Sequence, residues 1–237
     1  MVKKLNFPLR KKVCWFGFKF VLGGLALFWI SFDFSILSLL FFLFSAGYIY
    51  FNSGKFRSFV KASFLIWISL GCFLKLINPE LKIYFVLIEL FFLFFLLTLV
   101  DFKPKRSLYL PVNSLLYLFS LIFLFKFSGL NYFLVCFFLL LVSLILFFEG
   151  LSFDQFEPSL IKRFKLTDLV SSFILVQLFL FLSWLNIGFL KISLLLSIAF
   201  CTLRDVSINY FKGNQKNVLV YLIAGLILAI IVQIIKF

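Results

Sequence analysis

The chain is poor in the residues on which most enzymatic sites depend. It has no histidine, and only nine of its 237 residues are acidic. The absence of histidine excludes a Ser-His-Asp triad, a histidine general base and a Cys/His zinc site. The four cysteines lie far apart without a Cys-x-x-Cys pair, and we interpret each as a small buried apolar residue. The sequence identifies neither a metal site nor a cofactor, and it favours a non-enzymatic protein.

Apolar side chains, by contrast, are in large excess. Hydrophobic residues make up 64% of the chain, 40 residues are phenylalanine, and the mean hydropathy is +1.18. A soluble domain contains about 45–50% apolar residues, because its surface is too large to hide more. The charged residues cluster between long apolar runs, which is typical of a chain whose solvent is lipid. We expect a multi-pass protein of a cell membrane, in our interpretation the bacterial cytoplasmic membrane.

The net charge of +14 does not indicate a nucleic-acid binder. The basic residues form short clusters at the ends of apolar segments, not a stripe interleaved with aromatics on a soluble face. We therefore expect the lipid bilayer as the main partner, with other proteins beside it if the chain belongs to a membrane complex, and no nucleic acid.

The lengths of the apolar runs predict where the chain turns. As one helix, residues 15–51 would be about 55 Å long, whereas a bilayer core is about 30 Å thick, so we expect a turn at the polar residues 31–35. The same reasoning divides residues 169–211 at Asn186. The predicted fold is an all-α, polytopic transmembrane helical bundle, one integral membrane domain over residues 1–237. Its nine predicted spans are 13–32, 34–51, 62–77, 83–100, 108–125, 132–149, 169–187, 191–211 and 218–235.

The basic residues also predict the orientation of this bundle. With the N-terminus in the cytoplasm, the inner segments carry sixteen lysines and arginines and the outer segments carry four. The alternation has no exception along the chain, as the positive-inside rule requires. The inner ones are the five in the basic tail 1–12, then Lys55, Arg57, Lys61, Lys103, Lys105, Arg106, Lys162, Arg163, Lys165, Lys212 and Lys216. The outer ones are Lys82, Lys126, Lys191 and Lys236.

Residues 150–168, between the sixth and seventh predicted spans, are expected to form an interfacial amphipathic helix on the cytoplasmic side. Apolar residues from Phe153 to Phe164 recur at near-helical spacing, and basic residues follow Pro158, which suits a first helical turn. Such a segment lies with its apolar face in the acyl boundary and its cations near lipid phosphates. We interpret it as a topological anchor, and a role in substrate gating is the alternative.

Ionisable residues inside the predicted spans are the first candidates for function. Each costs about 2.5–3.5 kcal/mol on insertion scales and therefore tends to face protein or water. Glu89 lies in the fourth span among isoleucine, leucine and phenylalanine. It is a candidate for binding a proton or a cation. Alternatively, it bonds a neighbouring helix or pairs with Lys75 near the end of the third span.

A second group of candidates lies towards the cytoplasmic face. Arg204 and Asp205 are neighbours on one helix and point in different directions, so we expect Arg204 to pair with a carboxylate of another helix. Carboxylates with an arginine suit Mg²⁺ and a phosphate, although they equally serve as helix caps and as counter-charges for lysines. The candidates here are Glu149, Asp154, Glu157, Asp168, Arg204 and Asp205, with Glu149 and Asp168 the expected partners of Arg204.

The uncharged polar residues Asn113 and Gln177, also inside predicted spans, either line a path or hold helices together by hydrogen bonds. In the ninth span, Gly225 and Ala229 form a small-xxx-small patch that favours close helix packing.

Three functions remain open from the sequence. The first is a small transporter or the membrane subunit of a larger complex, favoured by the lack of a soluble domain and of a catalytic motif. The second is an enzyme that acts on a lipid or a lipid-linked phosphate at the cytoplasmic face. The third is a structural membrane scaffold without a ligand.

Overall fold

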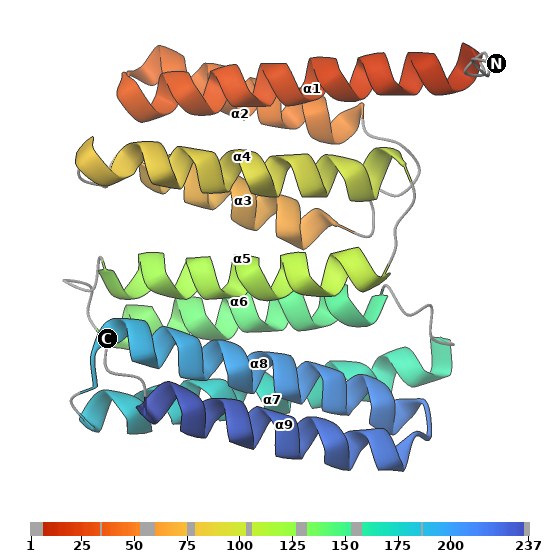
Figure 1. Ribbon diagram of the computed structural model, residues 1–237, viewed down its shortest axis with the longest axis vertical. Helices are drawn as coiled ribbons and strands as arrows, with labels where there is room; N and C mark the ends of the chain where they lie inside the picture. Colours follow the sequence, from red (N-terminus) through yellow and green to blue (C-terminus); the bar gives the residue numbers. More distant parts are fainter. Residues whose placement is uncertain are drawn as a thin grey trace. The chain divides into compact units, whose positions relative to one another are not determined.

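The computed structural model describes residues 7–33, 35–52, 60–74, 79–102, 106–126, 132–152, 158–185 and 187–234. Within these ranges the chain forms nine α-helices and no strand (Figure 1). The helices are α1 (Phe7–Phe32), α2 (Ile36–Phe51), α3 (Lys61–Phe73), α4 (Pro79–Asp101), α5 (Arg106–Lys126), α6 (Tyr132–Ser152), α7 (Pro158–Trp184), α8 (Phe189–Phe211) and α9 (Gln215–Ile234). The predicted all-helical class is confirmed.

Six of the described helices are long and apolar enough to cross a membrane. The qualifying stretches are Lys11–Phe32, Lys82–Asp101, Leu108–Phe125, Tyr132–Gly150, Leu166–Trp184 and Lys216–Ile234. Helices α2 and α3 are apolar but shorter, with 16 and 13 residues, and α8 is not among the six. These lengths and compositions are compatible with an integral membrane protein.

The two turns predicted from helix length occur where expected. Helix α1 ends at Phe32, and Ser35 begins α2 with a reciprocal capping box, in which Ser35 and Ser38 each accept from the other's backbone N–H. Such a box satisfies two donors that a helix start otherwise leaves unpaired. Further on, α7 ends at Trp184 and α8 begins at Phe189, on either side of the predicted break.

The separate amphipathic helix expected within residues 150–168 is not found. Pro158 begins a helix as predicted, but that helix is α7 itself, which runs without a break to Trp184. No glycine or proline lies inside it, so its backbone hydrogen bonds continue through the basic residues into the apolar stretch. Asp168 therefore lies inside α7 and does not cap its start.

The contacts divide the chain into two compact units, Met1–Val112 and Asn113–Phe237, whose boundary falls inside α5. In the first unit, α1 packs against α2, α3 and α4, and α3 packs against α2 and α4. The fully buried ring of Trp67 on α3 contacts Phe42 of α2. A Cβ at Gly71 would lie 2.6 Å from the Phe42 ring, so glycine allows α3 to approach α2.

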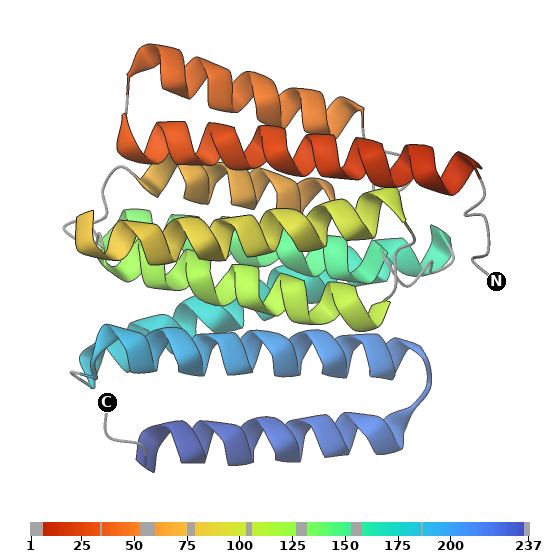
Figure 2. The ribbon, with the colours of Figure 1, turned by 45° about the horizontal axis from the view of Figure 1, so that its top comes forward.

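In the second unit, α8 packs against α6, α7 and α9 (Figure 2). Helices α8 and α9 are antiparallel neighbours, joined by a turn in which Gly213 has φ +75°. At Gly225 of α9 a Cβ would overlap the hydroxyl of Thr202 on α8, which confirms the close packing predicted there. Helix α8 carries more of the buried polar residues described in this unit than any other helix, namely Ser193, Ser197, Arg204, Ser207 and Asn209.

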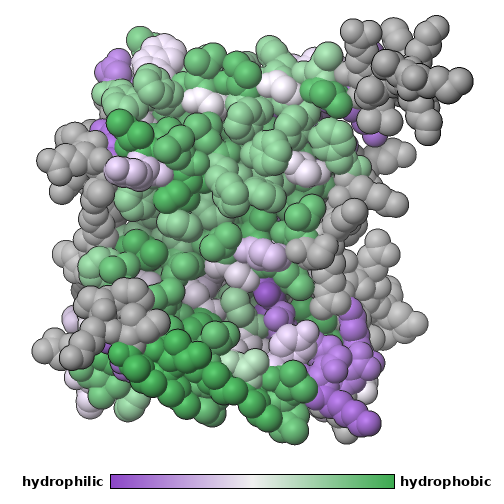
Figure 3. Space-filling model, in the orientation of Figure 1, coloured by the Kyte–Doolittle hydropathy of each residue, from purple (hydrophilic) through white to green (hydrophobic). Residues whose placement is uncertain are grey.

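The surface in Figure 3 is covered mostly by apolar side chains. A hydrophilic group at the lower right coincides with the turn between α8 and α9, where Lys212 and Lys216 are exposed. Exposed apolar side chains are numerous on α1, α2, α4, α6, α7 and α9, and on α9 they include Leu226, 64% exposed. A surface of this composition suits a lipid solvent.

Candidate functional site

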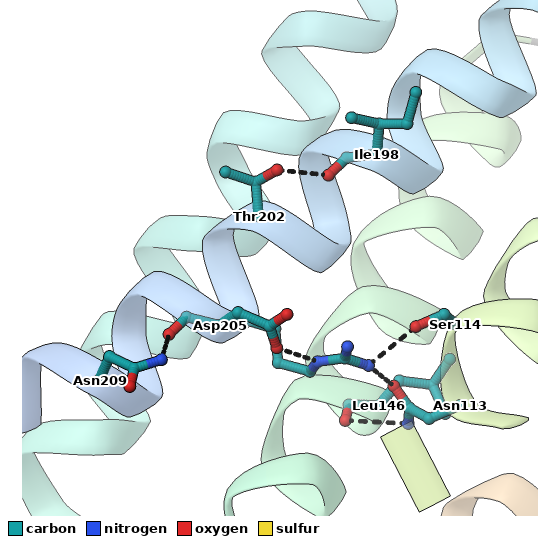
Figure 4. Close-up of polar contacts among 8 residues, drawn as sticks. Asn113, Ser114, Leu146, Ile198, Thr202, Asp205 and Asn209 are labelled. Carbon is teal, nitrogen blue, oxygen red and sulfur yellow. Dashed lines mark hydrogen bonds and ion pairs between the residues drawn. The ribbon is translucent and has the colours of Figure 1, made fainter. Parts of the chain in front are cut away.

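The most elaborate polar site surrounds Arg204 of α8, which is 3% exposed (Figure 4). Its Nη1 donates to Asn113 Oδ1 and to Ser114 Oγ on α5, at 3.0 Å each. Asn113 in turn donates its Nδ2 to the carbonyl of Leu146 on α6, at 3.4 Å. One guanidinium thus links α8 to α5, and through Asn113 to α6.

Arg204 also forms an ion pair within α8. Its Nε lies 3.1 Å from Asp205 Oδ1. The prediction that these neighbours do not pair is therefore wrong. The long arginine side chain places its Nε next to the Asp205 carboxylate, although the two Cα–Cβ bonds diverge. Asp205 also receives a bond at its backbone carbonyl from Asn209 Nδ2, at 2.7 Å.

Aromatic rings form the apolar wall of this site. The Phe200 ring lies one turn before Arg204, with the guanidinium carbon 5.7 Å from the ring centre. Tyr117 of α5 stacks on Phe200 at 4.1 Å, and its hydroxyl lies 3.1 Å from Ser143 Oγ on α6. On α6, a Cβ at Gly150 would be 3.4 Å from Arg204 Cδ, so the arginine stem fits against a residue without a side chain.

Asp168 does not pair with Arg204, contrary to one of the two predicted pairings. It is 2% exposed on α7, and its Oδ2 has no hydrogen-bond partner within the described part of the chain. Ser172, one turn further along the same helix, also has a buried hydroxyl without such a partner. Glu149 is buried near the end of α6. In the described ranges no three cysteine, aspartate or glutamate side chains are grouped so that they could hold a metal ion.

The first unit contains the other isolated acid, Glu89 of α4. Glu89 is 1% exposed, and its Oε2 has no hydrogen-bond partner among the residues described. Its backbone carbonyl accepts a bond from Trp67 Nε1 at 3.0 Å, which fixes α3 against α4 at this level. The position is thus an acid enclosed by packed apolar helices.

An ion pair that the sequence reasoning missed lies in the same unit. Lys19 of α1 is 3% exposed, and its Nζ donates to both carboxylate oxygens of Asp101 on α4, at 2.8 and 2.9 Å. The sequence does show a lysine inside the first apolar span. The cost of placing an ionisable residue in a span, which made Glu89 a candidate, applies to Lys19 as well. Its partner was hidden, because the two residues are 82 positions apart and meet only through the packing of α1 on α4.

The remaining predicted site residues are Gln177, Lys75, Asp154 and Glu157. Gln177 is exposed on α7. Lys75, Asp154 and Glu157 lie outside the described residues. Three of the candidates, Asn113, Arg204 and Asp205, are in direct contact in the structure.

No protein-family model, curated protein or solved structure matches the chain.

Proposed function

We propose that the chain is a small membrane transporter whose Glu89 carries a proton coupled to solute movement. The observation behind this proposal is the enclosure of the Glu89 carboxyl in apolar helices, with Oε2 left without a partner among the described residues. An ionised carboxylate at such a position would cost several kcal/mol, whereas the protonated acid is neutral.

This difference provides a coupling mechanism. The neutral acid is tolerated while it is enclosed, and the ionised acid requires water. A change of conformation that opens the site to water would therefore release the proton, and closure would require its uptake. Transport in which a solute drives that change would move protons with the solute.

Proteoliposomes with an entrapped pH indicator test the proposal. Mixtures of water-soluble metabolites are applied to one side, and proton movement is compared with that of empty liposomes. We expect a mixture that drives protons with the wild-type chain, and a loss of this signal to the level of empty liposomes in Glu89→Gln. Equal melting temperatures in detergent serve as the folding control. A proton signal that persists in Glu89→Gln would exclude Glu89 from the coupling.

The same observations support a membrane subunit of a larger complex as the alternative, since the exposed apolar helices suit protein partners as well as lipid. Mild-detergent extraction from the native membrane separates the two: a transporter acting alone migrates at the mass of its own oligomer. The lipid-phosphate enzyme has less support, because Asp205 is engaged by Arg204 and no three acidic side chains converge within the described ranges. The scaffold alternative leaves the isolated acid Glu89 without a role.

A further inference from the structure

A small aromatic cavity lies in the first unit beside the end of α1, and neither Glu89 nor Lys19 lines it. Its volume is about 380 Å³, within the range of about 300–1,000 Å³ that is typical of ligand pockets. It is lined by Leu25, Phe28, Trp29, Phe32, Asp33 and Phe41, of which Phe41 comes from α2 and all others from α1 or the residue after it.

The rings around this cavity are arranged in two pairs. Phe28 and Phe32 lie one turn apart on α1 with their centres 4.5 Å apart, and Trp29 meets Phe41 of α2 at 5.2 Å. Phe28, Trp29 and Phe32 are all at least 41% exposed, so the cavity is accessible from outside. Aromatic faces carry partial negative charge and attract cations, above all those with little bound water.

The one charged group at the cavity is the exposed carboxylate of Asp33. It accepts a long bond of 3.4 Å from Trp29 Nε1, and it has no cationic partner among the described residues. Asp33 follows the last residue of α1, where the helix dipole already contributes negative charge. The electrostatic potential of this cavity is therefore negative, because the aromatic faces, the acid and the helix C-terminus all contribute negative charge.

We propose that this cavity binds a free organic cation, a quaternary ammonium or similar weakly hydrated charge on an apolar body. The charge would lie over the Trp29 and Phe41 rings and near Asp33, and the body would contact Phe28, Phe32 and Leu25. Rings that served only to anchor the helix at a lipid interface would need no carboxylate among them. The assignment concerns binding alone and is independent of the transport proposal.

The test uses benzyltrimethylammonium and its neutral isostere, in which carbon replaces the ammonium nitrogen. Both are titrated calorimetrically into the full chain in maltoside micelles, with empty micelles as the blank. We expect saturable binding of the cation and none of the isostere. Equal binding of both, or no binding of the cation, would overturn the proposal.

Variants assign the binding to this cavity. Asp33→Asn keeps the shape and removes the charge, and we expect it to weaken the affinity about tenfold, with recovery in Asp33→Glu. Trp29→Leu should weaken binding by a similar factor. Phe44→Leu changes a 76% exposed ring of α2 outside the cavity and should leave the affinity unchanged. An unchanged affinity in Asp33→Asn, with the melting temperature preserved, would contradict the assignment.

A lipid headgroup is the other source of quaternary ammonium. The titration is therefore repeated in nanodiscs of phosphatidylglycerol with and without phosphatidylcholine. We expect the affinity for benzyltrimethylammonium to be equal in both. A marked loss of affinity in the discs that contain choline lipid would identify the headgroup as the occupant and overturn the assignment to a free cation.

Discussion

The buried ionisable residues of this chain are accommodated in three different ways. Lys19 is neutralised by Asp101 of another helix. Arg204 shares its donors between a carboxylate and two neutral side chains. Glu89 and Asp168 each keep an oxygen without a partner among the described residues. The first two arrangements satisfy the charge and stabilise helix packing, and the third leaves chemistry available. Of these two acids, Glu89 lies further from the ends of its apolar stretch, Lys82–Asp101, than Asp168 does in Leu166–Trp184, and the proposed function therefore rests on Glu89.

At Arg204 the shape of the guanidinium matters as much as its charge. Lysine offers a single ammonium and would be unable to contact Asp205 at one nitrogen and Asn113 and Ser114 at another. We expect Arg204→Lys to lower the free energy of unfolding by about 1–3 kcal/mol, because buried acceptors on α5 lose their donor. Thermal melts in detergent measure the effect.

The matched control is Lys216→Arg, an exchange between the same two residue types at an exposed position of α9. Its effect should stay within about 0.5 kcal/mol. If Arg204→Lys had the same melting temperature as the wild type, the bonds to α5 would contribute nothing to stability.

Among the elements, α8 differs most from its neighbours. It buries serine, asparagine and arginine side chains together, and two of its serines donate to carbonyls one turn back along the helix, as Ser197 does to Ser193 at 2.8 Å. Such bonds satisfy the hydroxyls without a second helix. They allow a helix with several polar side chains to pack inside a largely apolar protein, while Arg204 donates to side chains of α5.

The contact of α8 with α9 depends on one small residue. We expect Gly225→Ala to destabilise the protein by about 1–3 kcal/mol, because the added Cβ would overlap Thr202 and force the helices apart. Gly47→Ala is the matched control, since nothing lies within 4 Å of a Cβ there and alanine favours a helix. Melting temperatures in detergent compare the two variants. Equal melting temperatures would show that α9 can shift at no cost.

For the whole molecule, the orientation predicted from the basic residues is open to a direct test. Reporter tags placed after Lys55 and after Lys126 should lie on opposite sides of the membrane, the first in the cytoplasm and the second outside. A tag after Lys216 should again be cytoplasmic. Protease protection of the tags in intact cells measures this. Tags after Lys55 and Lys126 in one compartment would contradict the predicted map of spans.

Local properties of the chain were sufficient to predict its helices. Hydropathy and length act over one helix at a time, and they correctly predicted the helical class, the turn before Ser35 and the turn between α7 and α8. They failed at α7, because a charged first turn does not end a helix that lacks a glycine or proline. They did not determine the burial of Glu89, because Leu87 and Phe91 beside it are exposed while Glu89 is not.

By itself, then, the sequence determined that this protein is helical, apolar enough for a membrane, and equipped with isolated charges inside its helices. The tertiary structure alone decided what those charges meet. The pairing of Lys19 with Asp101, the bonds of Arg204 to α5 and the aromatic cavity beside Asp33 all join residues of different helices or turns. Such contacts depend on which helices pack together and at what rotation, and no local pattern of residues encodes that.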